Sequence, residues 1–293
     1  MENIKSVQQI LPPPATHMVG DGFRVHNFFP SGYQMGLHRM SPFFLLDYNS
    51  KIEFTPKDEP RGVGVHPHRG FETVTIAYHG KVAHHDSSGN SGVIGEGDVQ
   101  WMTAGSGVLH KEYHDKEYSK AGGPFQMVQL WVNLPAKDKM TTPKYQGIVN
   151  SQLGKYYLPD NQGVIEVIAG EHKGIKGAAS TFTSINMYNV RIKKGAVAEL
   201  SLAEKHNTGI VVIEGSVRVN DTETAPTDNF ILLRNDGTDI KLEALEDAVL
   251  LVLSGEPINE PIVPYGPFLM NTRAEIIQAY DDLAKGKFGV LED

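Results

Sequence analysis

Two short segments of this chain carry the residue types and the spacing of a metal site. His66-Pro67-His68 places two imidazoles at positions i and i+2, and His110-Lys111-Glu112 places an imidazole and a carboxylate at the same spacing. In a β-strand, side chains two residues apart point to the same face, about 6.5–7 Å apart along the strand. Two neighbouring strands can therefore direct four nitrogen and oxygen donors at one cation, and the first hypothesis is a metal centre.

The composition limits the class of protein. The chain has 293 residues, of which 40% are hydrophobic and 21% charged, as expected for a soluble globular protein with one large or two ordinary domains. Cysteine is absent, which excludes disulfides, thiolate ligands and cysteine nucleophiles and favours an intracellular location. The net charge of -8 and the lack of a basic run argue against direct nucleic-acid binding.

No segment predicts secretion, membrane insertion or nucleotide binding. Residues 1–14 lack the apolar core of a secretory signal, and no stretch approaches the roughly 18 consecutive apolar residues of a membrane span. Neither a phosphate-binding glycine loop nor a serine-hydrolase elbow is present in the required context. The sequence therefore predicts a cytoplasmic protein without membrane contact, with a monomer as the default.

Short apolar runs between glycines and prolines predict a strand-rich fold in two halves. Strands are expected at 71–78, 99–102 and 126–132, followed by a polar linker at 136–147. Regular spacing of the later strands favours a sandwich or a barrel. The later strands are expected at 164–169, 187–192, 196–202, 209–214, 216–219, 229–233 and 248–253.

One helix is expected near the end of the chain, at residues 272–283, because its apolar residues recur with helical spacing. Asn271 or Thr272 would be its N-cap. The predicted apolar stripe consists of Ile276, Ile277, Tyr280 and Leu283.

The histidine segments resemble the cupin pattern, and more specifically that of the pirin family. The resemblance rests on residues 66–75 (HPHRGFETVT), on 97–105 (GDVQWMTAG) with the following 110–112, and on 266–273 (GPFLMNTR). It implies an all-β fold of two cupin-type β-barrels (double-stranded β-helix or jelly roll) packed together, with a short C-terminal α-helix. Residues 1–146 would form the metal-binding domain. Residues 147–293 would form a metal-free cupin domain that ends in the helix.

The family resemblance also implies a ligand set of three histidines and one glutamate, which falls on His66, His68, His110 and Glu112. The general cupin pattern would choose Glu72 instead of Glu112, and strand parity does not separate the two carboxylates. We favour Glu112 and expect Glu72 to be a neighbour that fixes a histidine tautomer. These donors suit Fe, Ni, Mn, Cu, Zn or Co, and the resemblance points to Fe(II).

The resemblance implies a metal-dependent dioxygenase of the quercetin 2,3-dioxygenase type, which opens flavonol-like aromatic substrates with O₂. Glu112 or Glu72 would accept the proton of a substrate hydroxyl. The alternative is a non-catalytic iron-binding regulator, sensitive to redox state, that acts through a protein partner. A weaker third hypothesis is a cupin whose metal only stabilises the barrel.

Other polar residues near the motifs receive plainer interpretations. His84 and His85 lie in a polar segment and are expected in a solvated loop. Arg69 would pair with a carboxylate or a substrate, or else face solvent. Phe71 and Tyr113 are expected to pack within the sheets, although aromatic residues so close to the histidines could also line a pocket.

Overall fold

The computed structural model describes residues 3–292 and divides the chain into two compact, strand-rich units. One unit, here called the histidine unit, comprises residues 14–37, 43–150 and 258–292. The second unit comprises residues up to 13, 38–42 and 151–257. No helix among the described residues is long and apolar enough to span a membrane.

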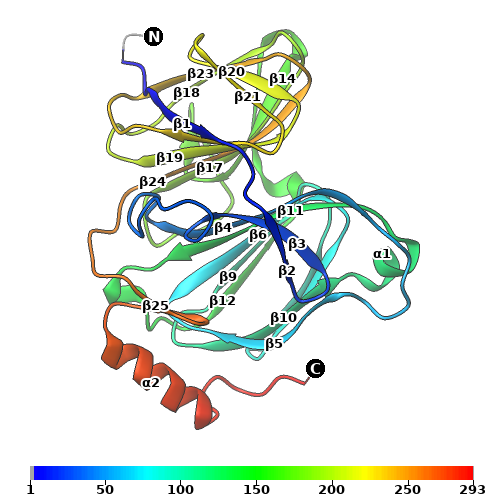
Figure 1. Ribbon diagram of the computed structural model, residues 1–293, viewed down its shortest axis with the longest axis vertical. Helices are drawn as coiled ribbons and strands as arrows, with labels where there is room; N and C mark the ends of the chain where they lie inside the picture. Colours follow the sequence, from blue (N-terminus) through cyan, green and yellow to red (C-terminus); the bar gives the residue numbers. More distant parts are fainter. Residues whose placement is uncertain (1–2, 293) are drawn as a thin grey trace. The chain divides into compact units, whose positions relative to one another are not determined.

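The histidine unit contains two large antiparallel sheets, a two-stranded sheet and two α-helices (Figure 1). Its larger sheet has the order β12-β9-β6-β11-β4-β3-β2, and its smaller sheet has the order β5-β10-β7-β8. The larger sheet consists of β2 (Thr16–Val19), β3 (Phe23–Phe29), β4 (Phe43–Phe54), β6 (Phe71–His79), β9 (Val99–Thr103), β11 (Gly123–Asn133) and β12 (Lys144–Ile148). The smaller sheet consists of β5 (Gly62–His68), β7 (Val82–Asp86), β8 (Ser91–Ile94) and β10 (Val108–His114). Helix α1 is Lys116–Ala121, and the C-terminal segment adds β25 (Val263–Tyr265), β26 (Phe268–Met270) and α2 (Arg273–Ala284).

The second unit repeats this two-sheet plan. Its larger sheet has the order β1-β22-β19-β24-β17-β14-β13, and its smaller sheet has the order β18-β23-β20-β21. The larger sheet consists of β1 (Val7–Leu11), β13 (Gly154–Tyr157), β14 (Gly163–Ala169), β17 (Ile185–Ile192), β19 (Asn207–Glu214), β22 (Phe230–Leu233) and β24 (Ala248–Gly255). The remaining strands are β15 (Glu171–His172), β16 (Ile175–Lys176), β18 (Val197–Ser201), β20 (Ser216–Val219), β21 (Glu223–Pro226) and β23 (Asp239–Ala244).

In each unit, apolar side chains from the larger and the smaller sheet meet in one core. In the histidine unit, Phe125 and Met127 of the larger sheet pack with Val82 and Ile94 of the smaller sheet. The second unit packs a larger core of this kind, with residues such as Val190 opposite Leu242. Each unit thus consists of two sheets that pack face to face, and the predicted all-β architecture of two cupin-type domains is confirmed.

Most strands expected from the sequence are present in the structure. The predicted strands at 71–78, 126–132 and 209–214 correspond to β6, β11 and β19. Two predictions were wrong. The supposed linker at 136–147 includes most of β12, which pairs with β9, and α1 is a second helix.

The structure divides the chain differently from the predicted boundary after residue 146. The first strand, β1, pairs with β22 of the second unit, while residues 258–292 belong to the histidine unit with α2. The assignment of β1 to the second unit and of residues 258–292 to the histidine unit depends on contacts between segments more than 190 residues apart. The Arg69–Asp282 ion pair is one such contact, and a local sequence pattern does not predict it.

The ion pair between Arg69 and Asp282 fixes α2 beside the turn that follows β5. Arg69 Nη1 lies 2.9 Å from Asp282 Oδ2, with both side chains less than 10% exposed, and the guanidinium stacks over Phe288. Buried charges of this kind are strongly destabilising when one partner is removed. Arg69 therefore pairs with a carboxylate rather than facing solvent.

Helix α2 begins with a capping box, as predicted for Thr272. Thr272 Oγ1 accepts from the backbone N–H of Glu275, and the Glu275 carboxylate accepts from the backbone N–H of Thr272. The predicted apolar stripe is only partly buried. Ile276 is 7% exposed, whereas Ile277 is 69% exposed and Tyr280 is 39% exposed.

We expect Thr272→Ala to destabilise the histidine unit by about 1 kcal/mol, because the helix loses its N-cap acceptor. Both tryptophans, Trp101 and Trp131, lie in this unit, so urea denaturation followed by tryptophan fluorescence reports on it. Thr222→Ala in the second unit is the control and should leave this transition in place. An unchanged midpoint for Thr272→Ala would show that the capping box does not stabilise the unit.

Candidate metal centre

Antiparallel pairing of β5 with β10 brings the predicted histidines together. In the register of this pair, His110 lies opposite His66, and Val108 lies opposite His68. Side chains of β10 alternate strictly, with His110, Glu112 and His114 buried, because one face of the strand points into the unit. β5 is an edge strand, as the proline between its histidines requires.

The three histidines form one cluster. The nearest ligand atoms of His66, His68 and His110 all lie within 4.8 Å of one another. Their ring centroids are 4.2 Å apart for His66 and His110, and 4.8 Å apart for each of the two pairs that include His68. Three imidazole nitrogens at this separation can bind one cation.

Hydrogen bonds orient two of the rings. His66 Nδ1 lies 2.8 Å from the carbonyl of Gly64, and His68 Nδ1 lies 3.2 Å from the carbonyl of Pro267. A carbonyl only accepts, so each Nδ1 is the protonated nitrogen and each Nε2 keeps its lone pair. This is the tautomer in which Nε2 binds a metal.

Burial favours the neutral form of two of the imidazoles. Burial, together with the neighbouring His66, lowers the pKa of His68 to about 3. Burial and the other histidines lower the pKa of His110 well below its usual value. His110 Nε2 is fully buried and makes no hydrogen bond in the described structure. An unpartnered buried nitrogen beside two other lone pairs fits a site built for a cation.

Glu112 lies next to this cluster, held by three donors. Its Oε2 accepts from Gln129 Nε2 at 2.7 Å, and its Oε1 accepts from Thr75 Oγ1 and Gln100 Nε2 at 3.3 Å each. A ligand oxygen of Glu112 lies within 4.8 Å of ring nitrogens of His110 and His84. The carboxylate is therefore buried, oriented and close to the histidines.

Glu72 occupies a different environment. A turn at Arg69–Gly70, with Gly70 at φ +88°, ends β5, and Glu72 follows on β6 in the other sheet. Glu72 therefore does not share a strand with His66 and His68, as it would have to for strand parity to place its side chain beside theirs. Its Oε1 accepts from Thr103 Oγ1 at 2.7 Å, and burial raises its pKa to about 7. The expected role in fixing a histidine tautomer is wrong, because backbone carbonyls orient His66 and His68.

His84 was missed as part of the site. It is fully buried on β7, directly opposite Glu112, and its ring stacks on Tyr145. The expected solvated loop is therefore wrong for His84, while His85 is exposed. The alternation in the sequence VAHHD, with His84 and Asp86 two residues apart, was the available signal.

A small cavity of about 30 Å³ adjoins the cluster. His66, Glu112 and Gln129 contribute to its lining, as does Asp47, which the sequence analysis did not identify. Burial raises the pKa of Asp47, although Asn27 Nδ2 donates to its Oδ1 at 2.7 Å. The apolar part of the lining consists of Val19, Phe23, Val25, Val63 and Met127.

Comparison with known protein families agrees with this architecture. Residues 22–132 match the Pirin family model, and residues 187–289 match the model of the Pirin C-terminal cupin domain. A Pseudomonas aeruginosa protein named "Putative quercetin 2,3-dioxygenase" is 47% identical over 285 residues, covering 97% of this chain and 99% of that protein. The chain belongs to the pirin family.

Solved structures of pirin-fold proteins extend the comparison. A quercetin 2,3-dioxygenase from Acinetobacter baumannii superposes with a TM-score of 0.92 at 48% identity, covering 99% of this chain and 100% of that one. A bacterial pirin from Escherichia coli, solved in complex with nickel(II), shares the fold at 21% identity with a TM-score of 0.64. That match covers 85% of this chain and 99% of the Escherichia coli protein.

The two carboxylates are distinguished by metal retention. We expect Glu112→Gln to lower the amount of metal bound per chain, and Glu72→Gln to leave it unchanged, because only Glu112 lies within reach of the histidine cluster. Elemental analysis of both variants after dialysis measures this. Full retention by Glu112→Gln with loss in Glu72→Gln would reverse the assignment.

The raised pKa of Glu72 makes the stability of the folded state depend on pH. Between its usual pKa of 4.5 and its folded pKa of about 7, the folded state holds a proton that the unfolded state releases. Its contribution is therefore fully present below about pH 4.5 and is lost as the pH rises through about 7.

As the pH rises from about 4.5 to about 7, we expect the free energy of unfolding of the wild type to fall relative to that of Glu72→Gln. Above this range the difference between the two proteins should be constant. Urea denaturation followed by tryptophan fluorescence at several pH values measures the difference. A pH-independent difference would show that Glu72 titrates normally.

Proposed function

We propose that His66, His68 and His110 bind a divalent ion through Nε2, with Glu112 as the fourth ligand. The support is the imidazole cluster, the tautomers held by Gly64 and Pro267, and the buried carboxylate beside it. Three imidazoles and one carboxylate accept Fe(II), nickel, manganese, copper, zinc or cobalt, and Fe(II) is proposed on the family resemblance.

We propose further that the loaded protein is a dioxygenase that opens flavonol-like aromatic rings with O₂. The observation that carries this is the agreement between the histidine cluster and the relatives at 47% and 48% identity that are named quercetin 2,3-dioxygenases. A divalent ion at these ligands supplies Lewis acidity, which lowers the pKa of a substrate hydroxyl.

Two carboxyl groups line the cavity and can take up the hydroxyl proton. Glu112 is oriented by Gln129 at 2.7 Å, whereas Asp47 stands outside the proposed ligand set. The raised pKa of Asp47 makes it a stronger base than an ordinary aspartate, since a base is most effective when its pKa is near the working pH. Glu72 is not among the residues that line the cavity, so we no longer assign it this role.

The size of the cavity and its apolar lining determine whether a substrate can enter. A cavity of about 30 Å³ holds one molecule of the size of water or O₂. A flavonol therefore enters only when lining side chains move. Met127 has the most adaptable side chain among them, because it is unbranched and turns about several bonds.

The small cavity also favours a second function, that of an iron-binding regulator that acts through a protein partner. In that case the ion would need no organic substrate, and its oxidation state would alter the surface around the edge strand β5. This hypothesis predicts iron binding without turnover of any flavonol.

Oxygen uptake by the Fe(II)-loaded protein with quercetin tests the dioxygenase. We expect turnover by the wild type, none by His110→Ala, and a loss of about 100-fold in kcat for Asp47→Asn through loss of the base. Glu72→Gln is the matched control with a buried carboxyl outside the cavity. An iron-loaded wild type that consumes no oxygen with quercetin or other flavonols would contradict the dioxygenase and support the regulator.

A further inference from the structure

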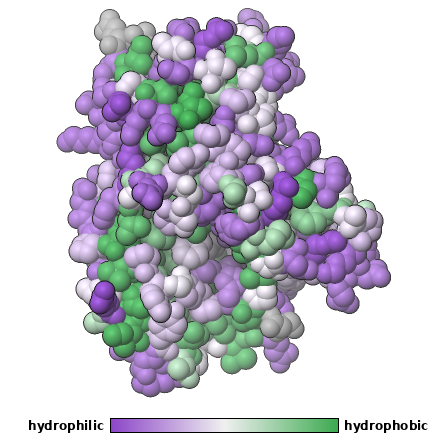
Figure 2. Space-filling view, in the orientation of Figure 1, coloured by the Kyte–Doolittle hydropathy of each residue, from purple (hydrophilic) through white to green (hydrophobic). Residues whose placement is uncertain are grey.

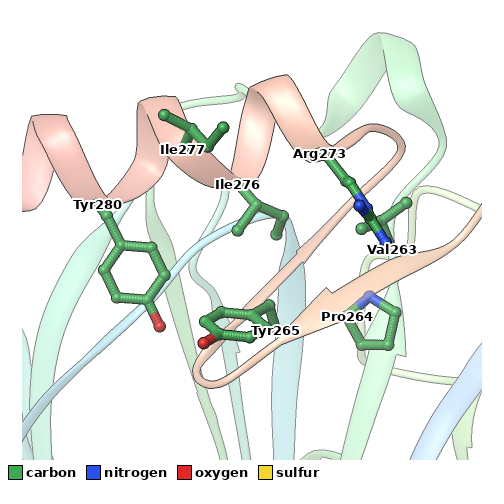
Figure 3. A pocket seen from close by; sticks show the side chains of 7 residues that line it. All are labelled: Val263, Pro264, Tyr265, Arg273, Ile276, Ile277 and Tyr280. Atoms are coloured by element: carbon green, nitrogen blue, oxygen red, sulfur yellow. The ribbon is translucent and has the colours of Figure 1, made fainter.

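The C-terminal segment of the histidine unit contains a second cavity that the metal centre does not use. It has a volume of about 520 Å³ and lies between α2 and the β25–β26 hairpin (Figure 3). We call it the α2 groove. Figure 2 shows hydrophobic surface where Figure 1 places β25 and α2. The groove is lined by Val263, Pro264, Tyr265, Arg273, Ile276, Ile277 and Tyr280.

Large apolar side chains remain exposed at this groove. Tyr265 of β25 is 65% exposed, and Ile277 of α2 is 69% exposed, although an amphipathic helix usually turns its large apolar residues toward the core. Ile276 and Tyr280 complete one wall, and the rings of Tyr265 and Tyr280 meet edge to face at 5.9 Å. The predicted apolar stripe of α2 thus continues beyond the core and forms one side of a concave surface.

Arg273 is the one charged residue of the lining. It is exposed to solvent, and its guanidinium makes no ion pair or hydrogen bond within residues 3–292. The nearest acidic residue along the helix, Glu275, is already bound to the backbone of Asn271 and Thr272. The residues three and four positions after Arg273 are isoleucines, so the helix provides no partner for the charge.

The charge and the aromatic rings lie at different places along the groove. Arg273 is at one end near Val263 and Pro264, and Tyr280 is at the other, with Ile276 between them (Figure 3). Seven residues separate Arg273 from Tyr280 on the helix, which corresponds to about 10 Å along its axis.

We propose that the α2 groove binds a small arylalkanoate, a molecule with one carboxylate and an aromatic ring on a short hydrocarbon chain. The guanidinium matches a carboxylate in a two-pronged hydrogen bond. The isoleucines and the tyrosine rings receive the hydrocarbon chain and the aromatic ring.

The size and charge of the groove select this class of ligand. A volume of 520 Å³ is typical of small-molecule sites. A phosphate would keep a second charge without a partner, because Arg273 is the only cation of the lining. A neutral aromatic compound would leave the guanidinium unpaired.

Titration with 4-phenylbutyrate tests the proposal in the full-length protein. Isoleucine methyl signals observed by NMR report directly on the groove through Ile276 and Ile277. We expect these signals to shift and saturate with a Kd on the order of 1 mM or tighter. Methyl signals of the second unit, such as that of Ile240, should not move. Equal affinity before and after metal removal will show that the carboxylate is not bound at the metal centre.

Variants separate the two parts of the interaction. Arg273→Gln should weaken 4-phenylbutyrate about tenfold through loss of a charge-assisted bond, without changing the affinity for neutral 4-phenylbutanol. Ile277→Asp, at an exposed position, should weaken both compounds. Lys285→Gln, at the C-cap of α2 and outside the groove, is the control and should change neither.

Absence of methyl shifts up to about 10 mM 4-phenylbutyrate, or binding that neither Arg273→Gln nor Ile277→Asp weakens, would overturn the proposal. A dimer by sedimentation whose contact covers the groove and excludes the probe would overturn it as well. These outcomes do not depend on dioxygenase activity.

Discussion

The antiparallel register of β5 and β10 is the constraint on which the candidate metal centre depends. It places His66 directly opposite His110 and leaves His68 on the same face, two residues further along β5. A slip of one residue would turn the side chains of a whole strand to the other face. The three imidazoles would then no longer converge, whatever their spacing in the sequence.

Hydrogen bonds and burial hold the clustered side chains in the tautomer and orientation that metal binding requires. Carbonyl oxygens of Gly64 and Pro267 fix the tautomers of His66 and His68, and burial lowers the pKa of His68 and of His110. Gln129 orients the Glu112 carboxylate through a hydrogen bond to its Oε2. A site whose ligands are oriented before a cation arrives loses little entropy on binding it.

The C-terminal segment contributes to both the candidate metal centre and the α2 groove. Pro267 lies between β25 and β26, so the hairpin that borders the α2 groove also holds the ring of His68. The buried Arg69–Asp282 pair joins the same segment to the turn after β5. Residues 258–292 are therefore part of the environment of the metal centre, although Pro267 follows His68 by 199 residues in the sequence.

The sequence by itself determined the strand-rich fold, most strand positions, the helix at Thr272 and the three histidines. These follow from local rules, namely alternation along strands, turn glycines, a capping residue and the i, i+2 spacing of donors. The family resemblance supplied the choice of Glu112, which spacing alone left open against Glu72.

Tertiary structure alone decided the rest. Glu72 is separated from the histidines because the turn at Gly70 moves it to another sheet, and His84 enters the site because β7 pairs with β10. The membership of residues 258–292 in the histidine unit and the raised pKa of Asp47 were also hidden. These features depend on which distant strands pair and on what surrounds a side chain. The spacing of neighbouring residues in the sequence determines neither the pairing nor the surroundings.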